Sequence, residues 1–214
     1  MNRTRLSIGV LVAATAFLLI KGAVLFTGGG YDPSREVALM EQARGYALGC
    51  QIAKDLPPGG VVVFMDTLPS TDALRATAAN LRNGLQNGAG KALRVERYEA
   101  PLQRKKGLPD FLQERTHGTS HLERLPDALA AHPGAVAVVA RIDLSEDLPP
   151  AVAAAGVPPL YVLGFGGEAE WQKLLRSGRV RAVQIDRVEG YAAGDSPRQI
   201  EAAAELYFRV IPAP

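Results

Sequence analysis

Cysteine and histidine are both scarce in this sequence of 214 residues. Cys50 is the only cysteine, so no disulfide can form within the chain. We interpret it as a buried thiol on a helix face, because free cysteine is usually buried. The three histidines lie in or beside one polar stretch. Nucleophilic hydrolysis by a Ser/His/Asp or Cys/His set therefore has little support.

The histidines also provide little basis for a metal site. His117 and His121 are four residues apart with Glu123 close by, a spacing that on a helix would form part of a metal-binding face. Gly118 between them breaks a helix, and a third ligand is not evident. We expect neither a bound metal nor a cofactor.

Long basic runs are absent as well. The densest, Arg104-Lys105-Lys106, is interpreted as a solvated loop. The chain carries 24 Lys and Arg against 22 Asp and Glu, and Arg3, Arg5 and Lys21 all precede residue 27. The remainder thus has 21 basic and 22 acidic residues, a net charge of −1. A domain with this near-neutral charge lacks the excess of basic residues that nucleic-acid binding needs, and we expect no nucleic acid as a partner.

The N-terminus does contain a long apolar segment. Leu6–Phe26 is interrupted only by Lys21, and at ~1.5 Å per residue it would span ~31 Å, the thickness of one hydrocarbon core. Arg3 and Arg5 should stay cytoplasmic, which places the rest of the chain outside. The sequence predicts an uncleaved, single-pass anchor in a bacterial inner membrane, with a periplasmic C-terminal domain. A cleaved signal peptide with Leu6–Ile20 as its apolar region is the alternative.

Three segments follow from this pattern. Residues 1–27 are predicted to form the signal-anchor transmembrane helix, 28–33 a glycine-rich linker, and 34–214 the α/β domain. Asp32 and Pro33 are typical of a helix start. The helix they begin carries an apolar stripe at helical spacing, formed by Val37, Met40, Ala43, Ala47 and Cys50.

Apolar strand-like segments then alternate with helical ones. The run VVVFMDT at 61–67 is typical of a strand covered on both faces. The helix after it has Leu74, Ala78, Leu81 and Leu85 on one stripe, a cap at Ser70 or Thr71, and an end at Asn87-Gly88. Further strands are predicted at 92–100, 134–143, 159–165 and 179–186, and the last helix could end in a short edge strand. This alternation predicts an α/β fold with a doubly wound, mostly parallel sheet.

Three stretches resemble the type 1 periplasmic sugar-binding proteins, the family that includes ribose-binding protein and the ligand domains of LacI-type repressors. They are VVVFMDTLPSTDALRATAANLRNGLQ, LPDALAAHPGAVAVVARID and LYVLGFGGEAEWQKLLRSGRVRAVQIDRVEGYAAGD, about half of the soluble chain. The resemblance implies the family's lobe and a sugar-like ligand. Family members bind ligand between two lobes, whereas we expect one lobe or a trimmed pair here. The resemblance also places Gly166 where the family has a ligand-binding aspartate, so that contact is missing, and Asp186 near a polar ligand contact.

Polar residues gather where the predicted strands end. Ligands of open parallel sheets bind beyond the carboxyl ends of the strands, and a helix N-terminus offers free N–H groups nearby. The rim suits a small polar ligand, although strand ends are also polar because loops are solvated. The candidate ligand-binding residues are Asp66, Thr67, Ser70, Thr71, Arg141, Asp143, Gly166 and Asp186.

The stretch from Gly164 to Ala169 has the G-x-G-x-x-A spacing of a dinucleotide loop, and Asp186 follows 22 residues after Gly164. Glu168, however, would repel a pyrophosphate at the helix start. We interpret the stretch as a tight strand-to-helix turn, with glycines that serve backbone geometry.

These patterns favour a membrane-anchored, non-enzymatic module that binds or senses a small polar ligand, with a transporter or another membrane complex as its partner. Two alternatives stay open. One is a structural or interaction subunit of a membrane complex in which the ligand cleft has been lost. The other is a dinucleotide-binding oxidoreductase that uses the Gly164–Ala169 loop.

Overall fold

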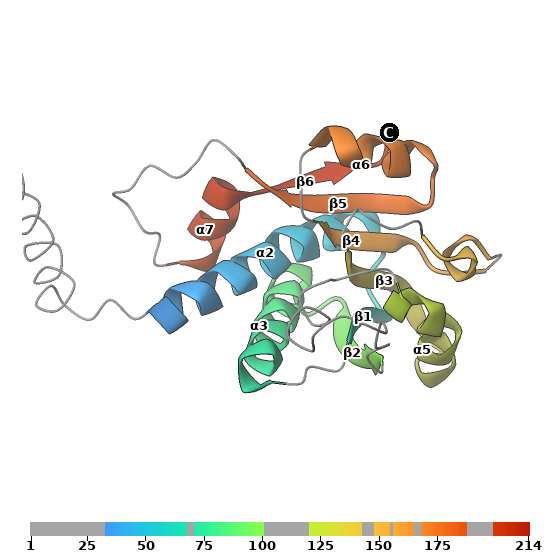
Figure 1. Cartoon of the computed structure of the whole chain (residues 1–214), viewed down its shortest axis with the longest axis horizontal. Helices are drawn as coiled ribbons and strands as arrows, with labels where there is room; N and C mark the ends of the chain where they lie inside the picture. The colour runs from blue at the N-terminus through green and yellow to red at the C-terminus, as the bar shows by residue number, and fades with distance from the viewer. Residues whose placement is uncertain are drawn as a thin grey trace, which may run out of the picture. The chain divides into compact units, whose positions relative to one another are not determined.

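The computed structural model describes residues 33–67, 71–100, 120–142, 148–154, 156–164, 168–187 and 199–214 (Figure 1). The chain divides into two units, Met1–Glu36 and Val37–Pro214, and the fold below is that of the second. Among the described residues no helix has both the length and the apolar character needed to cross a bilayer. The predicted span Leu6–Phe26 lies outside these residues, as does the predicted linker 28–33 except for Pro33, which is the first residue of a helix.

Within the described ranges, six strands form one sheet in the order β2-β1-β3-β4-β5-β6. The first five strands are parallel, and β6 runs antiparallel to β5 at one edge. The predicted α/β fold with a mostly parallel sheet is therefore confirmed, as is the edge strand near the chain end. The strands are β1 (Val61–Thr67), β2 (Arg94–Ala100), β3 (Ala135–Ile142), β4 (Leu160–Gly164), β5 (Val180–Asp186) and β6 (Phe208–Pro212).

Helices precede, connect and follow these strands. The Thr71 hydroxyl accepts a hydrogen bond from the Leu74 N–H at 3.3 Å, which confirms the cap predicted for α3. The prediction that α3 ends at Asn87-Gly88 is wrong, because the helix continues to Ala89. The helices are α2 (Pro33–Asp55), α3 (Asp72–Ala89), α5 (Leu125–Ala131), α6 (Glu168–Arg176) and α7 (Ile200–Tyr207), with 3-10 helices η1 (Ser120–Arg124) and η2 (Pro150–Ala153).

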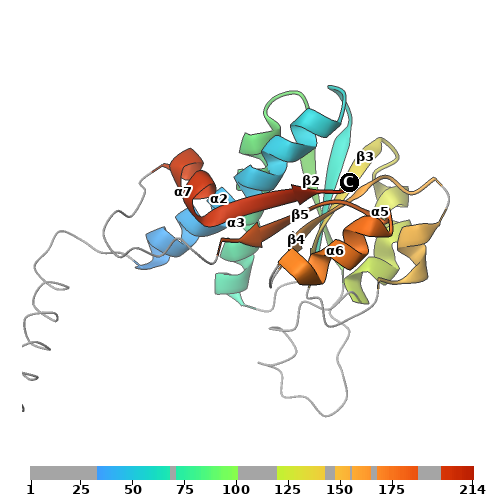
Figure 2. The same ribbon diagram turned by 90° about the horizontal axis from the view of Figure 1, so that it is seen from above.

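The order of the connections explains which helix covers which face of the sheet. The chain moves from β1 to β2 in one direction and then across β3, β4 and β5 in the other. Right-handed crossovers place the helices of the two directions on opposite faces. Accordingly α3 lies on one face and α5 and α6 on the other (Figure 2). Among the described helices, no crossover helix covers β4 and β5 on the α3 face, and α2, which precedes β1, packs there.

Two apolar layers fill the space between the sheet and the helices. The layer on the α5 and α6 face includes Met65, Val138, Val162 and Trp171. The layer under α2 and α3 includes Phe64, Val139, Tyr161, Leu48 and Leu85. Both sets are buried, as expected for valine-rich strands covered on both faces.

The apolar stripe predicted for α2 is only partly right. Ala43 is buried, but Val37 is 56% exposed and Cys50 is half-buried rather than buried. The side chains that α2 buries most deeply against the sheet are Leu48 and Ile52. The stripe shifts because the second neighbour of α2 is α3, which meets it on a side lined by glycine.

Two glycine pairs bring α2 and α3 into backbone contact. Gly45 and Gly49 lie one turn apart on α2, and Gly84 and Gly88 lie one turn apart on α3. A Cβ atom on Gly84 would lie 2.8 Å from the carbonyl carbon of Gln42. The neighbour is backbone, so no flexible side chain could move aside. This contact explains why α3 continues through Gly88.

The middle and the C-terminal end of α2 are bonded to the sheet. Arg44 Nη2 donates to Asp186 Oδ1 at 3.0 Å and Oδ2 at 3.3 Å. Towards the other end, the Tyr161 hydroxyl donates to Asp55 Oδ2 at 3.1 Å, and Gln51 Nε2 donates to Asp55 Oδ1 at 2.8 Å. Burial, and then the neighbouring Asp55 carboxylate, raises the pKa of Tyr161, so the hydroxyl remains a donor at neutral pH.

Replacing Gly84 with alanine tests the helix crossing. The added methyl group would meet backbone, so we expect Gly84→Ala to lower the free energy of unfolding by about 1–3 kcal/mol, despite the better helix propensity of alanine. Chemical denaturation measures this change. Gly134→Ala is the control, because a Cβ atom there meets nothing within 4 Å, and it should stay within about 0.5 kcal/mol of the wild type. Equal effects of the two substitutions would contradict the proposed contact.

Candidate functional site

The sheet has a topological switch point between β1 and β3. The chain leaves β1 for β2 on one side and returns to β3 on the other, and ligands of open α/β sheets bind beyond the carboxyl ends of the strands at such a point. Met65 of β1 pairs with Ala140 of β3. In the same register the next residues, Asp66 and Arg141, lie side by side at this point.

Strand alternation directs three polar side chains to one face. Phe64, Val139 and Ala182 belong to the layer under α2 and α3. Side chains two positions further along a strand point the same way. Asp66, Arg141 and Gln184 therefore follow that layer towards the carboxyl ends of the strands.

Asp66 forms the first ion pair of this region. It is 8% exposed, and Arg97 Nη2 lies 3.3 Å from its Oδ2. Arg97 comes from β2, and its Nη1 also lies 2.7 Å from Glu99 Oε1. The Arg97 side chain is 17% exposed and that of Glu99 is 37% exposed. The cation is thus set below the surface between two carboxylates.

Arg44 forms the second set of ion pairs. Besides Asp186 it contacts Glu41 Oε1, at 3.4 Å. Its guanidinium lies over the ring of Phe208, 5.2 Å from the centroid. The Arg44 side chain is 13% exposed, whereas that of Asp186 is 51% exposed. Here too the cation is buried and one carboxylate faces solvent.

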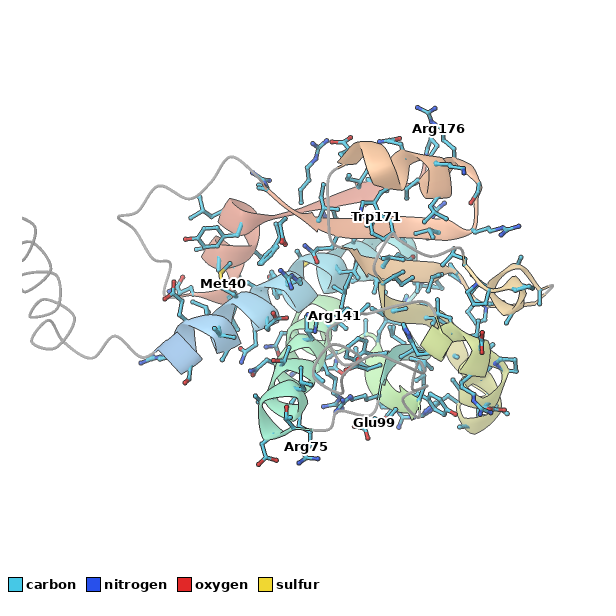
Figure 3. All side chains as sticks on the ribbon, viewed as in Figure 1. Met40, Arg75, Glu99, Arg141, Trp171 and Arg176 are labelled. Atoms are coloured by element: carbon cyan, nitrogen blue, oxygen red, sulfur yellow. The ribbon has the colours of Figure 1, made fainter. Side chains whose placement is uncertain are left out.

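Arg141 is electrostatically coupled to both sets. Burial lowers the pKa of its guanidinium, the Glu41 carboxylate raises it, the Arg44 cation lowers it, and Asp66 and Asp186 raise it. Arginine nevertheless remains charged. We call this group the charged edge, and Figure 3 labels two of its members, Arg141 and Glu99. It consists of Glu41, Arg44, Asp66, Arg97, Glu99, Arg141 and Asp186.

The structure brings together three of the candidate ligand-binding residues, namely Asp66, Arg141 and Asp186. Thr71 instead uses its hydroxyl to cap α3, and Thr67 is the last residue of β1. The other candidates, Ser70, Asp143 and Gly166, lie outside the described residues.

Sequence reasoning missed four members of the charged edge. Arg97 and Glu99 lie two and four residues after the buried Val95 and so share its face of β2, a signal that could have placed them on that side of the strand. Glu41 and Arg44 are three residues apart on α2, a common surface pattern. Nothing in the sequence shows that α2 reaches the end of β5.

Side-chain packing explains the first glycine of the Gly164–Ala169 loop. A Cβ atom on Gly164 would lie 2.6 Å from Trp171 Cζ2 and 2.8 Å from Val183 Cγ1. Glu168, at the start of α6, accepts a hydrogen bond from Arg209 Nη1 at 2.9 Å. Gly164 thus makes room for the Trp171 ring, which agrees with the structural interpretation of the turn. Residues 165–167 lie outside the described ranges.

The proposed histidine pair is only partly described. His121 is buried in η1, and His117 lies outside the described residues. In the part of the chain that the structure covers, no three His, Cys, Asp or Glu side chains are arranged to hold a metal ion.

Comparison with known proteins yields matches at the level of structure. No protein-family model matches the sequence, and no curated protein matches it. One similar structure is a sugar-binding protein of a sugar ABC transporter from Bacillus halodurans, with 16% identity and a TM-score of 0.46. Another is GanP, a glucose-galactose binding protein from Geobacillus stearothermophilus, with 14% identity and a TM-score of 0.47. A third is an ABC transporter solute-binding protein from Burkholderia graminis in complex with D-arabinose, with 15% identity and a TM-score of 0.46.

The three neighbours are described as sugar-binding or solute-binding proteins. The matches cover 68%, 81% and 80% of this chain, in the same order. They cover 45%, 60% and 59% of the neighbours, so the chain spans about half of their length.

Neutralising Asp66 tests the ion pair at the switch point. Asp66→Asn removes one partner of the buried Arg97, and we expect it to lower the free energy of unfolding by about 1–3 kcal/mol. Thermal or chemical denaturation measures the change. Asp72→Asn is the matched control, because Asp72 also pairs with an arginine, at 2.6 Å, but its side chain is 96% exposed; its effect should stay below about 1 kcal/mol. A larger loss at Asp72 than at Asp66 would disprove the assignment.

Proposed function

We propose that this protein is a membrane-anchored, extracytoplasmic α/β domain that binds or senses a small polar ligand at the charged edge and is not an enzyme. The observation that carries the proposal is the placement of Asp66 and Arg141. They are oppositely charged, largely withdrawn from solvent and adjacent across the switch point of the sheet. Open parallel sheets bind their ligands at this point.

The chemistry of the charged edge suits binding. Its carboxylates accept hydrogen bonds and its guanidinium groups donate them, so hydroxyl groups can be held in either role. The arginines are buried between carboxylates, which fixes their positions before any ligand arrives. Preorganisation of this kind lowers the entropic cost of binding. Sugars and small polyols, the class named for the similar structures, are the first ligands to screen.

The proposed location depends on the N-terminus. Leu6–Phe26 has the length and apolar character of a membrane span, with Arg3 and Arg5 before it. We propose a single-pass anchor in a bacterial inner membrane, with residues 34–214 in the periplasm and a transporter or another membrane complex as the partner. The alternative, a structural subunit that binds no ligand, predicts no thermal shift with any small molecule. The ligand screen below separates the two functions.

A ligand screen tests the binding function. The full chain, purified in detergent, is heated with monosaccharides and small polar metabolites, and at least one should raise the midpoint of thermal unfolding. Asp186→Asn removes one charged acceptor from the solvent-facing side of the edge, so affinity for that ligand should fall about tenfold. Asp127→Asn, on α5 at the opposite face of the sheet and with a side chain that is 57% exposed, should bind as the wild type does. If no ligand shifts the midpoint of thermal unfolding, the binding function is disproved. The remaining alternative is then a structural subunit of a membrane complex, and detergent pull-down should recover its stable partner.

Protease protection tests the location. Protease added to intact spheroplasts should digest the chain beyond residue 30, because that region is proposed to lie outside the inner membrane. A cytoplasmic protein of the same cells is the control and should stay intact. If the region beyond residue 30 is spared until the membrane is lysed, the proposed orientation is wrong.

A further inference from the structure

Gln184 is a buried amide beneath α2. It lies on β5, between Leu163 of β4 and Val210 of β6 in the register of the sheet. It is 0% exposed. Alternation along β5 directs it to the same face as Ala182, towards α2. It is also two residues before Asp186, which Arg44 of α2 binds.

Two contacts show which part of α2 covers this amide. Arg44, in the middle of the helix, is bonded to Asp186, and Asp55, its last residue, lies 3.7 Å from Arg181. The C-terminal half of α2 therefore runs along β5 from Asp186 back to Arg181. Gln184 lies between those two contacts, under this half of the helix.

The amide of Gln184 has no hydrogen-bond partner among the described residues, at either Nε2 or Oε1. The side-chain amide of Gln86, by comparison, is fully hydrogen-bonded. Its Nε2 donates to the carbonyls of Gly90 and Leu93 at 2.8 and 3.0 Å, and its Oε1 accepts from the Val95 N–H at 2.9 Å. Proteins rarely bury a side-chain amide without partners, because its desolvation is then not compensated.

A second buried atom, about one turn before Arg44 on α2, also lacks a partner. Glu41 Oε2, on α2, has none within the described part of the chain, whereas Glu41 Oε1 contacts Arg44. The two side chains together offer one donor, Gln184 Nε2, and two acceptors, Gln184 Oε1 and Glu41 Oε2. A hydroxyl group can satisfy both kinds, since it donates and accepts.

The charged side chains of the charged edge do not favour a charged ligand. Arg44 has both Glu41 and Asp186 as partners, and Arg97 has both Asp66 and Glu99. With Arg141 counted, four carboxylates face three arginines in the charged edge. In return for losing its hydration, an anion would gain no unbalanced opposite charge and a cation would gain at most one. The chemistry therefore favours an uncharged molecule.

We propose that Gln184 and Glu41 contact the ligand of the charged edge, that this ligand is a small uncharged hydroxylated molecule, and that α2 covers it. The proposal rests on the ligand-binding function and adds two contact residues and a covering helix. Neither residue lies at the end of a strand, so the usual rule for parallel sheets does not find them.

The first experiment uses near-isosteric substitution. Gln184→Met removes an amide that has no partner in the free protein, so the midpoint of thermal unfolding should stay the same or rise, by about 2–4 °C. Gln86→Met is the matched control and should lower the midpoint, because it deletes three hydrogen bonds. A midpoint that falls for Gln184→Met as much as for Gln86→Met would overturn the proposal, since the partner of Gln184 would then lie within the chain.

The second experiment uses D-glucose, D-glucosamine and D-glucuronate, which share a ring and differ in charge. The full chain in detergent should bind D-glucose at least tenfold more tightly than the two charged sugars, and Gln184→Met should lose at least tenfold in affinity. Tighter binding of a charged sugar, or unchanged affinity in Gln184→Met, would overturn the inference while leaving the ligand-binding function standing. If none of the three binds, this inference fails, and the wider screen alone decides the proposed function.

A third measurement needs no substitution. Cys50 is the only cysteine and lies on α2, half-buried. Saturating D-glucose should slow its reaction with a thiol reagent severalfold, because a ligand beneath α2 holds the helix against the sheet. Ligand binding with an unchanged labelling rate would show that α2 is not the cover.

Discussion

The packing of α2 against the sheet is the constraint on which this domain depends. Right-handed connections place α3 on one face and the later helices on the other. They leave β4 and β5 bare beside α3, and valine-rich strands exposed on one face would be unfavourable in water. Helix α2 fills this position. It fits beside α3 because four glycines remove the side chains that would otherwise separate the two helices.

The position of α2 also shapes the charged edge. Glu41 and Arg44 reach the carboxyl ends of the strands only because the helix crosses that part of the sheet. Arg44 and Arg97 are arranged alike. Each arginine lies further from solvent than one of its carboxylate partners, which is Asp186 for Arg44 and Glu99 for Arg97. Buried ion pairs contribute little net stability, because desolvation offsets their attraction. Their value here lies in holding charged groups at defined positions around the switch point.

The loop after β4 shows how one pattern can serve two purposes. Glycine spacing that matches a dinucleotide loop arises here, at its first position, from the need to pack Trp171 over the strand. The acid that could have held a ribose is engaged by Arg44, and Glu168 is engaged by Arg209. A glycine that admits a tryptophan ring and a glycine that admits a phosphate look the same in sequence. Only the neighbouring atoms distinguish them.

Local patterns along the chain were sufficient for the layer architecture. The bounds predicted for β1 match residue for residue, and the cap at Thr71 is correct, because strand period and helix capping depend on near neighbours. The strand-end rule predicted Asp66, Arg141 and Asp186 as ligand contacts. The structure places Arg141 within electrostatic reach of both acids, and their role in binding stays a prediction. The tertiary structure alone decided that Glu41, Arg44 and Gln184 lie near these residues, and that Gly84 and Gly88 meet the backbone of α2. These facts depend on where α2 meets strands and helices far away in the sequence, and no local period encodes such a contact.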